Sequence, residues 1–153
     1  MFGIATAGGR RGQGNLDWRV KALLFSLAAL SAGAACGAVL GLLGSLVGER
    51  ERIVATSLVA VAFAAAGLAQ LRPRSSHWLP QRDCETAQGW LRYGAVGWAV
   101  LNGGALGTGF LSRIGFISWY AVPLASVAFG SAALGALIYG AYGGVRGFAV
   151  WFW

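Results

Sequence analysis

Two cysteines are the side chains of this chain best suited to redox chemistry. Cys36 lies within a long apolar segment, whereas Cys84 lies in a polar stretch between two such segments, and the chain has no Cys-x-x-Cys motif. A disulfide exchange would require the Cα atoms of the two residues to come within about 7 Å of each other. We expect Cys36 to be a small packing residue and Cys84 a reduced thiol, with a redox pair as the alternative.

The polar stretch around Cys84 also contains the one histidine of the chain, His77, together with Asp83 and Glu85. Their spacing matches no zinc-binding pattern, and a single histidine with a single cysteine offers too few ligands. No Ser–His–acid or Cys–His set is implied either. The sequence therefore predicts no metal site, no cofactor and no enzymatic activity.

Polar and helix-breaking residues inside apolar segments form a third group of candidates. The stretch LNGGALGTGF, residues 101–110, places Asn102 and Thr108 among four glycines. Buried polar groups are costly in a membrane unless they are paired or line a cavity, and glycine-rich interruptions occur in the discontinuous helices of transporters. With Arg113 at its mouth and a kink at Pro123, this region could form a transport pathway. The favoured alternative is a tightly packed helix followed by a proline kink.

The composition around these residues is that of a membrane protein. Hydrophobic residues make up 57% of the 153 residues and charged residues 11%, whereas soluble domains carry about 25% charged residues. Apolar segments cover residues 22–47, 53–71, 93–112 and 114–145, and a spanning helix needs about 20 apolar residues. The sequence predicts an all-α, polytopic integral membrane protein with four transmembrane helices. Residues 18–153 form the membrane domain, which follows a flexible basic tail at 1–17.

The basic residues set the expected orientation. They gather in the tail and in the connection 72–92, whereas Arg50 and Arg52, in the turn after the first segment, alternate with Glu49 and Glu51, which balance their charge. The positive-inside rule then places both termini in the cytoplasm. The net charge of +7 is explained by this topology and by attraction to anionic headgroups, so nucleic-acid binding is not expected.

Small residues recur at helical spacing in the first and fourth segments. Ala29, Gly33, Gly37 and Gly41 stand four residues apart and therefore share one helix face, and Gly135 belongs to a second small-residue set. Helices associate in lipid through close backbone approach, which small side chains allow. We expect these faces to pack helices together within the chain, and we expect a homo-oligomer or a complex with other membrane subunits.

The run from Gln88 to Arg146 contains the stretches QGWLRYGAVGW, LGTGFLSRIGF, WYAVP and GALIYGAYGGVR. It resembles the second half of a set of small actinobacterial-type polytopic membrane proteins. Those proteins are similar to half of the cytochrome c biogenesis/DsbD-type transmembrane family. The resemblance implies a multi-pass helical fold in a bacterial inner membrane and, for that family, electron transfer through intramembrane cysteine pairs. Only Cys36 lies in a predicted span here, so the resemblance supports the fold more than the activity.

Three functions follow from these observations, in order of preference. The first is an accessory or structural subunit that packs through glycine-rich helix faces. The second is a small oligomeric transporter with its pathway at Asn102, Thr108, Arg113 and Pro123. The third is a transmembrane thiol-redox carrier that uses Cys36 and Cys84.

Overall fold

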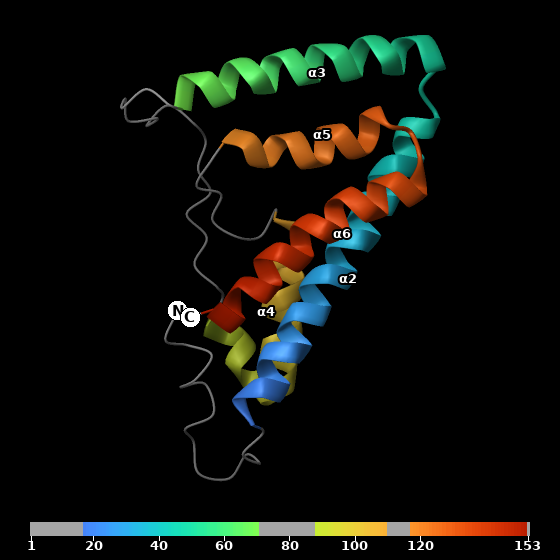
Figure 1. Ribbon diagram of the computed structural model, residues 1–153. Coiled ribbons are helices and arrows are strands. Elements are labelled where there is room, and N and C mark those ends of the chain that lie inside the picture. Colours follow the sequence, from blue (N-terminus) through green and yellow to red (C-terminus); the bar gives the residue numbers. More distant parts are fainter. Residues whose placement is uncertain (1–16, 71–87, 110–116, 153) are drawn as a thin grey trace.

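The computed structural model describes residues 17–70, 88–109 and 117–152, and these ranges contain five α-helices and no strand (Figure 1). The α-helices are α2 (Trp18–Ser45), α3 (Glu49–Gln70), α4 (Gly94–Thr108), α5 (Ala121–Ala128) and α6 (Ala132–Phe148). The 3-10 helices are η1 (Gln88–Tyr93), η2 (Ile117–Tyr120) and η3 (Ala149–Phe152). The prediction of an all-α fold is confirmed for this part of the chain.

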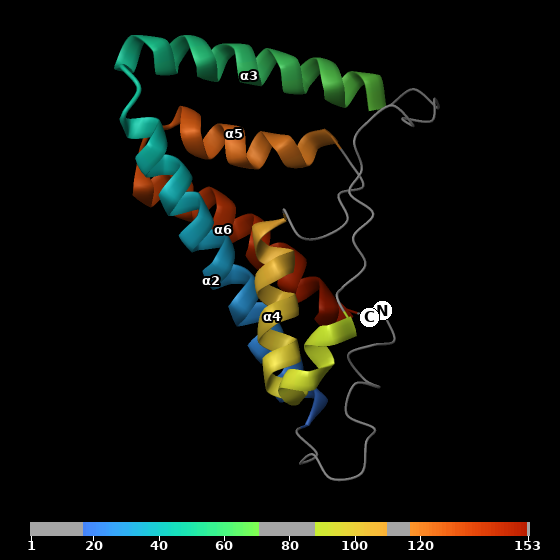
Figure 2. The same cartoon turned by 180° about the vertical axis from the view of Figure 1, so that it is seen from behind.

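Helices α2, α4 and α6 form a bundle, and α3 and α5 lie side by side and extend away from one end of it (Figures 1 and 2). Gly37 of α2 lies against Gly135 of α6, and the hydroxyl of Ser26 lies 3.0 Å from the carbonyl oxygen of Gly147, so α2 and α6 are antiparallel. Gly103 of α4 lies against Phe25, at the level where α2 begins. The core of the described chain is therefore the seam between these three helices.

Helix α2 is the one described helix that is long and apolar enough to cross a membrane. Its 28 residues extend about 42 Å at 1.5 Å per residue. The Asp17 side chain caps its first turn by accepting a hydrogen bond from the backbone N–H of Arg19, at 3.4 Å. Helices α4, α5 and α6 have only 15, 8 and 17 residues, so the described chain does not support four spanning helices.

The third predicted segment is shorter in the structure, and the fourth is divided into two helices. Helix α4 has 15 residues and ends at Gly109, which adopts φ +72°. The segment 114–145 was expected to kink at Pro123, and this expectation is wrong: Pro123 lies in the first turn of α5, where a missing N–H breaks no helical hydrogen bond. The break comes at Gly130, whose φ of +56° ends one helix before the next begins.

Helix α3 packs on α5 rather than along α2, because the small-residue face of α2 is already covered by α4 and α6. Two side chains near its start hold it in place. Arg52 Nη1 donates to the carbonyl oxygen of Gly130 at 3.3 Å, and Thr56 Oγ1 lies 3.5 Å from that of Ala128. Both carbonyls belong to the end of α5, where helix carbonyl groups lack intrahelical partners.

Candidate functional site

The predicted packing residues lie in the seam between α2, α4 and α6. Ala29, Gly33, Gly37, Gly41 and Gly135 are all buried. A Cβ atom at Gly37 would overlap the carbonyl group of Gly135, and one at Gly33 would lie 2.7 Å from the carbonyl oxygen of Tyr139. The glycine faces are thus occupied within one chain. A contact between subunits would need a different surface.

Glycines of α4 complete this seam, although their number in the sequence had suggested a possible break in the helix. Cβ atoms at Gly103 and Gly107 would overlap the backbone of Phe25 and Ala29. The stretch LNGGALGT is therefore continuous helix in close contact with α2, as the favoured interpretation expected. Its glycines bring two backbones together, which is the role that small residues have between membrane helices.

Helix α4 ends beside the middle of α2, and a polar cluster surrounds this end. The carbonyl oxygen of Gly107 lies 3.3 Å from where a Cβ atom of Gly33 would be, and α2 continues for twelve residues beyond Gly33. The hydroxyl of Tyr139, which is fully buried, donates a 2.6 Å hydrogen bond to the carbonyl oxygen of Thr108. The indole of Trp119 packs against Gly109. The carbonyl group of Thr108, at the end of α4, is thereby paired inside the protein.

Cys36 belongs to the same cluster. It precedes Gly37, where a Cβ atom would overlap that of Tyr139, so the two residues belong to the same contact between α2 and α6. Tyr139 packs edge-on against Tyr142, with ring centroids 5.9 Å apart, and Arg146 Nη1 donates to the Tyr142 hydroxyl at 2.7 Å. A row of polar groups thus follows one face of α6. Cys84, the other half of the predicted redox pair, lies outside the described residues.

Tyr139 was not among the predicted site residues. Tyrosine is counted among the hydrophobic residues in the composition. The stretch GALIYGAYGGVR was therefore interpreted as a packing face because of its glycines, and the tyrosine hydroxyl groups were not considered as polar sites. The signal that singled out Asn102, a polar group deep in an apolar segment, applies equally to Tyr139 and to the buried Ser26.

The four predicted pathway residues are not brought into one site. Asn102 Nδ2 donates to the carbonyl oxygen of Trp98 at 2.8 Å, and Thr108 Oγ1 donates to that of Ala105 at 3.0 Å. Six residues separate Asn102 from Thr108, which places them about 9 Å apart along the axis and on different sides of α4. Pro123 belongs to α5, and Arg113 lies outside the described residues.

Asn102 nevertheless has one unusual feature. Its side chain is 4% exposed, and its Oδ1 atom has no hydrogen-bond partner among the residues that the structure describes. The amide cannot be reversed to correct this, because the oxygen would then face the carbonyl oxygen of Trp98. A buried acceptor without a donor is unfavourable, and most such groups in proteins are paired.

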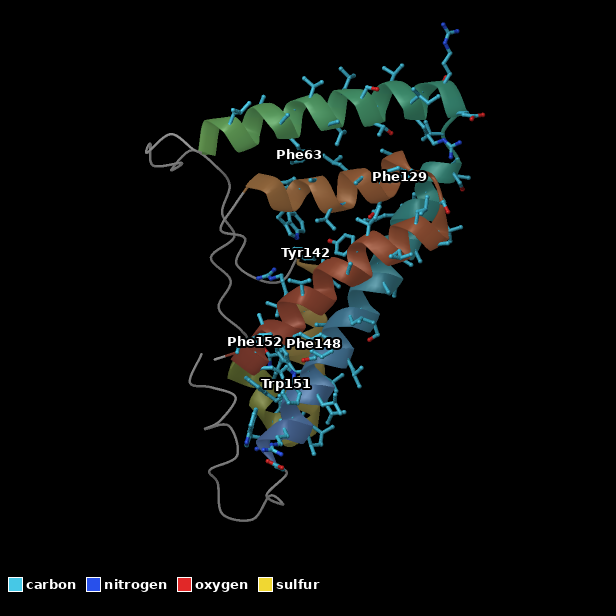
Figure 3. The ribbon with its side chains drawn as sticks, in the orientation of Figure 1. Phe63, Phe129, Tyr142, Phe148, Trp151 and Phe152 are labelled. Atoms are coloured by element: carbon cyan, nitrogen blue, oxygen red, sulfur yellow. The ribbon has the colours of Figure 1, made fainter. Side chains whose placement is uncertain are left out.

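Aromatic and basic residues gather at the end of the bundle where α2 begins and η3 finishes. The rings of Trp18 and Trp151 are 5.8 Å apart, and Trp151 Nε1 donates to Ser26 Oγ at 3.1 Å. Figure 3 shows Phe148, Trp151 and Phe152 close together at this end. We call the set Trp18, Arg19, Lys21, Arg92, Tyr93, Phe148, Trp151 and Phe152 the aromatic–basic end. Tryptophan at such a position favours the headgroup level of a membrane.

Comparison with known proteins finds no matching protein-family model, no matching curated protein and no matching solved structure. The resemblance to the cytochrome c biogenesis/DsbD-type family therefore stays a prediction. The chain is defined by its own geometry as an all-helical protein with one helix apolar enough to cross a membrane and a core closed by glycine contacts.

Proposed function

We propose that the protein is a multi-pass protein of a bacterial inner membrane and serves as an accessory or structural subunit. The bundle of α2, α4 and α6 forms its core, and α3 binds a helix of another subunit, either a second copy or a different membrane protein. Both termini face the cytoplasm, as the distribution of basic residues predicts.

The outer surface of α2 supports a membrane location. Large apolar side chains cover it and are 41% to 57% exposed, namely Leu23, Leu27, Leu30, Val39, Leu42 and Leu43. Soluble monomers rarely expose contiguous apolar surface on this scale, whereas lipid solvates it without penalty.

The exposure of α3 carries the proposal of a subunit role. Its large apolar residues away from α5 are 54% to 68% exposed, namely Ile53, Val54, Leu58, Val61 and Leu68. Between them lies an exposed row of small residues, Ala60, Ala64 and Gly67, and a Cβ atom at Gly67 would meet nothing within 4 Å. Whereas the glycines of the core are filled by neighbouring backbones, this row is open. Such a row allows a partner helix to approach closely.

Substitution of Gly67 tests this role. Gly67→Leu places a bulky side chain on the open row without touching the core, so it should reduce the complex recovered in mild detergent by roughly tenfold, the effect of about 1.4 kcal/mol. Leu27→Phe, which adds bulk on the outer face of α2, is the control and should leave recovery unchanged. Mass spectrometry of the recovered complex tells a second copy from a foreign subunit. Equal recovery of wild type and Gly67→Leu would refute the α3 interface.

Transport of a small polar solute is the second candidate, and the unpaired Oδ1 of Asn102 is the observation that favours it. A buried acceptor retained at a cost is a common feature of solute pathways in membranes. In a strain that lacks the wild-type protein, Asn102→Ala should then fail to restore the wild-type phenotype, although the same complex is recovered. Under the subunit proposal, Gly67→Leu abolishes the phenotype and Asn102→Ala preserves it.

A further inference from the structure

Lys21 is the most unusual cation of the described chain. It lies in the first turn of α2 and is only 7% exposed, although lysine is almost never this buried unless it is paired. The described part of the chain provides it with no ion pair and no side-chain hydrogen bond. Asp17, the carboxylate closest in sequence, instead caps α2 through the N–H of Arg19. Lys21 therefore lacks a counter-ion where one is needed.

Lys21 lies in the first turn of α2, so its ammonium group is close to the end of the bundle although the side chain as a whole is only 7% exposed. Lysine adopts this arrangement where an apolar environment meets a polar one, with the stem along the protein and the charge at the boundary. An anion at that boundary would complete the site.

The other residues of the aromatic–basic end suit a ligand that is both anionic and apolar. The Arg19 guanidinium lies 5.9 Å from the centre of the Trp18 ring, and that of Arg92 lies 4.8 Å from the centre of the Tyr93 ring. Phe152 is 88% exposed beside the partly exposed Trp151. An acidic protein segment would satisfy the cations but leave this aromatic surface in water, whereas a phospholipid covers both.

The charge of the aromatic–basic end differs from that of the opposite end of α2. Here Arg19, Lys21 and Arg92 outnumber the capping Asp17, and the positive end of the α2 helix dipole adds to their field. At the far end, the cations of the α2–α3 turn alternate with Glu49 and Glu51. An anion is therefore attracted to one end only.

From these observations we infer that the aromatic–basic end binds the phosphate group of an anionic phospholipid, with the Lys21 ammonium as the central contact and Arg19 and Arg92 beside it. Trp18 and Trp151 lie against the glycerol and upper acyl region. This inference rests on the membrane location in the proposed function. It goes beyond general attraction to the bilayer, because it assigns selectivity to one lysine.

Thermal unfolding of the purified full-length protein in detergent tests the inference, with phosphatidylglycerol or phosphatidylcholine added. At a lipid concentration about ten times Kd, phosphatidylglycerol should raise the Tm of the wild type by roughly 3 to 6 °C. Lys21→Met keeps the apolar stem and removes the charge, and it should lose this rise. Arg50→Gln removes one exposed charge from the opposite end and should keep it.

Three outcomes would overturn the inference. They are an equal rise with phosphatidylcholine, an equal rise for Lys21→Met and wild type, and an equal rise with inorganic phosphate alone, which would indicate a site for free phosphate. If Lys21→Met does not fold, the exposed Arg19→Gln and Arg92→Gln together replace it, with the same expected loss. Recovery of the wild type in the soluble fraction after alkaline extraction would refute the proposed function itself. Membrane recovery without lipid selectivity would refute only this inference.

Discussion

The hydroxyl of Tyr139 donates a 2.6 Å hydrogen bond to the backbone carbonyl oxygen of Thr108, and this bond ties α6 to the last turn of α4. Carbonyl groups at a helix end lack intrahelical partners, and a buried carbonyl group without a partner is unfavourable. The bond therefore allows α4 to stop beside the middle of α2 without leaving that carbonyl group unpaired.

Removing the Tyr139 hydroxyl should destabilise the protein. Tyr139→Phe keeps the ring but leaves the buried Thr108 carbonyl oxygen without this partner, which should cost about 1–3 kcal/mol. Thermal unfolding in detergent measures the effect as a lower Tm. Tyr142→Phe is the matched control, because Tyr142 is less buried and serves as acceptor for Arg146. A Tyr139→Phe protein as stable as the control would show that the bond contributes little.

Adding a methyl group to the glycine seam should separate α2 from α6. At Gly37 the new Cβ atom would overlap the Gly135 carbonyl group, and backbone atoms cannot move aside as a flexible side chain can. We expect Gly37→Ala to lose about 2–3 kcal/mol of stability, as overpacked cores do. Gly67→Ala makes the same change on open surface and should gain up to about 1 kcal/mol in helix propensity. Similar Tm values for the two variants would contradict a close backbone contact between α2 and α6 at Gly37.

Arg52 should hold α3 against the junction between α5 and α6. Its guanidinium donates to the Gly130 carbonyl oxygen, and loss of a charged donor costs about 1–3 kcal/mol. Arg52→Gln should therefore speed hydrogen exchange in the first turns of α3 and in α5. The control is Arg50→Gln, since Arg50 lies two residues earlier in α3 and its side chain is exposed. Unchanged exchange in Arg52→Gln would mean that apolar packing alone positions α3.

Asn102 offers a test of whether its unpaired oxygen matters. Asn102→Ala removes a buried acceptor that has no donor and introduces a better helix former, so the Tm should stay the same or rise slightly. A fall of several degrees would reveal a donor bound to Oδ1, such as a buried water or a solute. Asn102→Asp should be strongly destabilising, because it places an unpaired charge in the seam.

The repeat of small residues four positions apart made the buried face of α2 predictable, because Gly33, Gly37 and Gly41 can share a helix face in only one way. Their partner was not predictable, since glycine rows occur in both α4 and α6. Spacing shows that a close contact exists and leaves open which backbone fills it.

The division of the fourth segment was misplaced for a local reason. Pro123 is the conspicuous helix breaker, yet a proline in the first turn is tolerated. Gly130 is inconspicuous because other glycines nearby are helical, and only its positive φ distinguishes it. The site at the end of α4 was missed because the Tyr139 hydroxyl matters only where another helix ends opposite it.

The antiparallel seam between α2 and α6 also imposes an order of events during synthesis. Helix α2 leaves the ribosome about 90 residues before α6 begins, an interval of roughly 5 to 18 s at ordinary translation rates. Throughout that interval the glycine face of the first helix has no α6 to cover it. The nascent chain must therefore keep α2 from pairing with other helices until its last helix arrives, and a factor that shelters α2 during synthesis would meet this need.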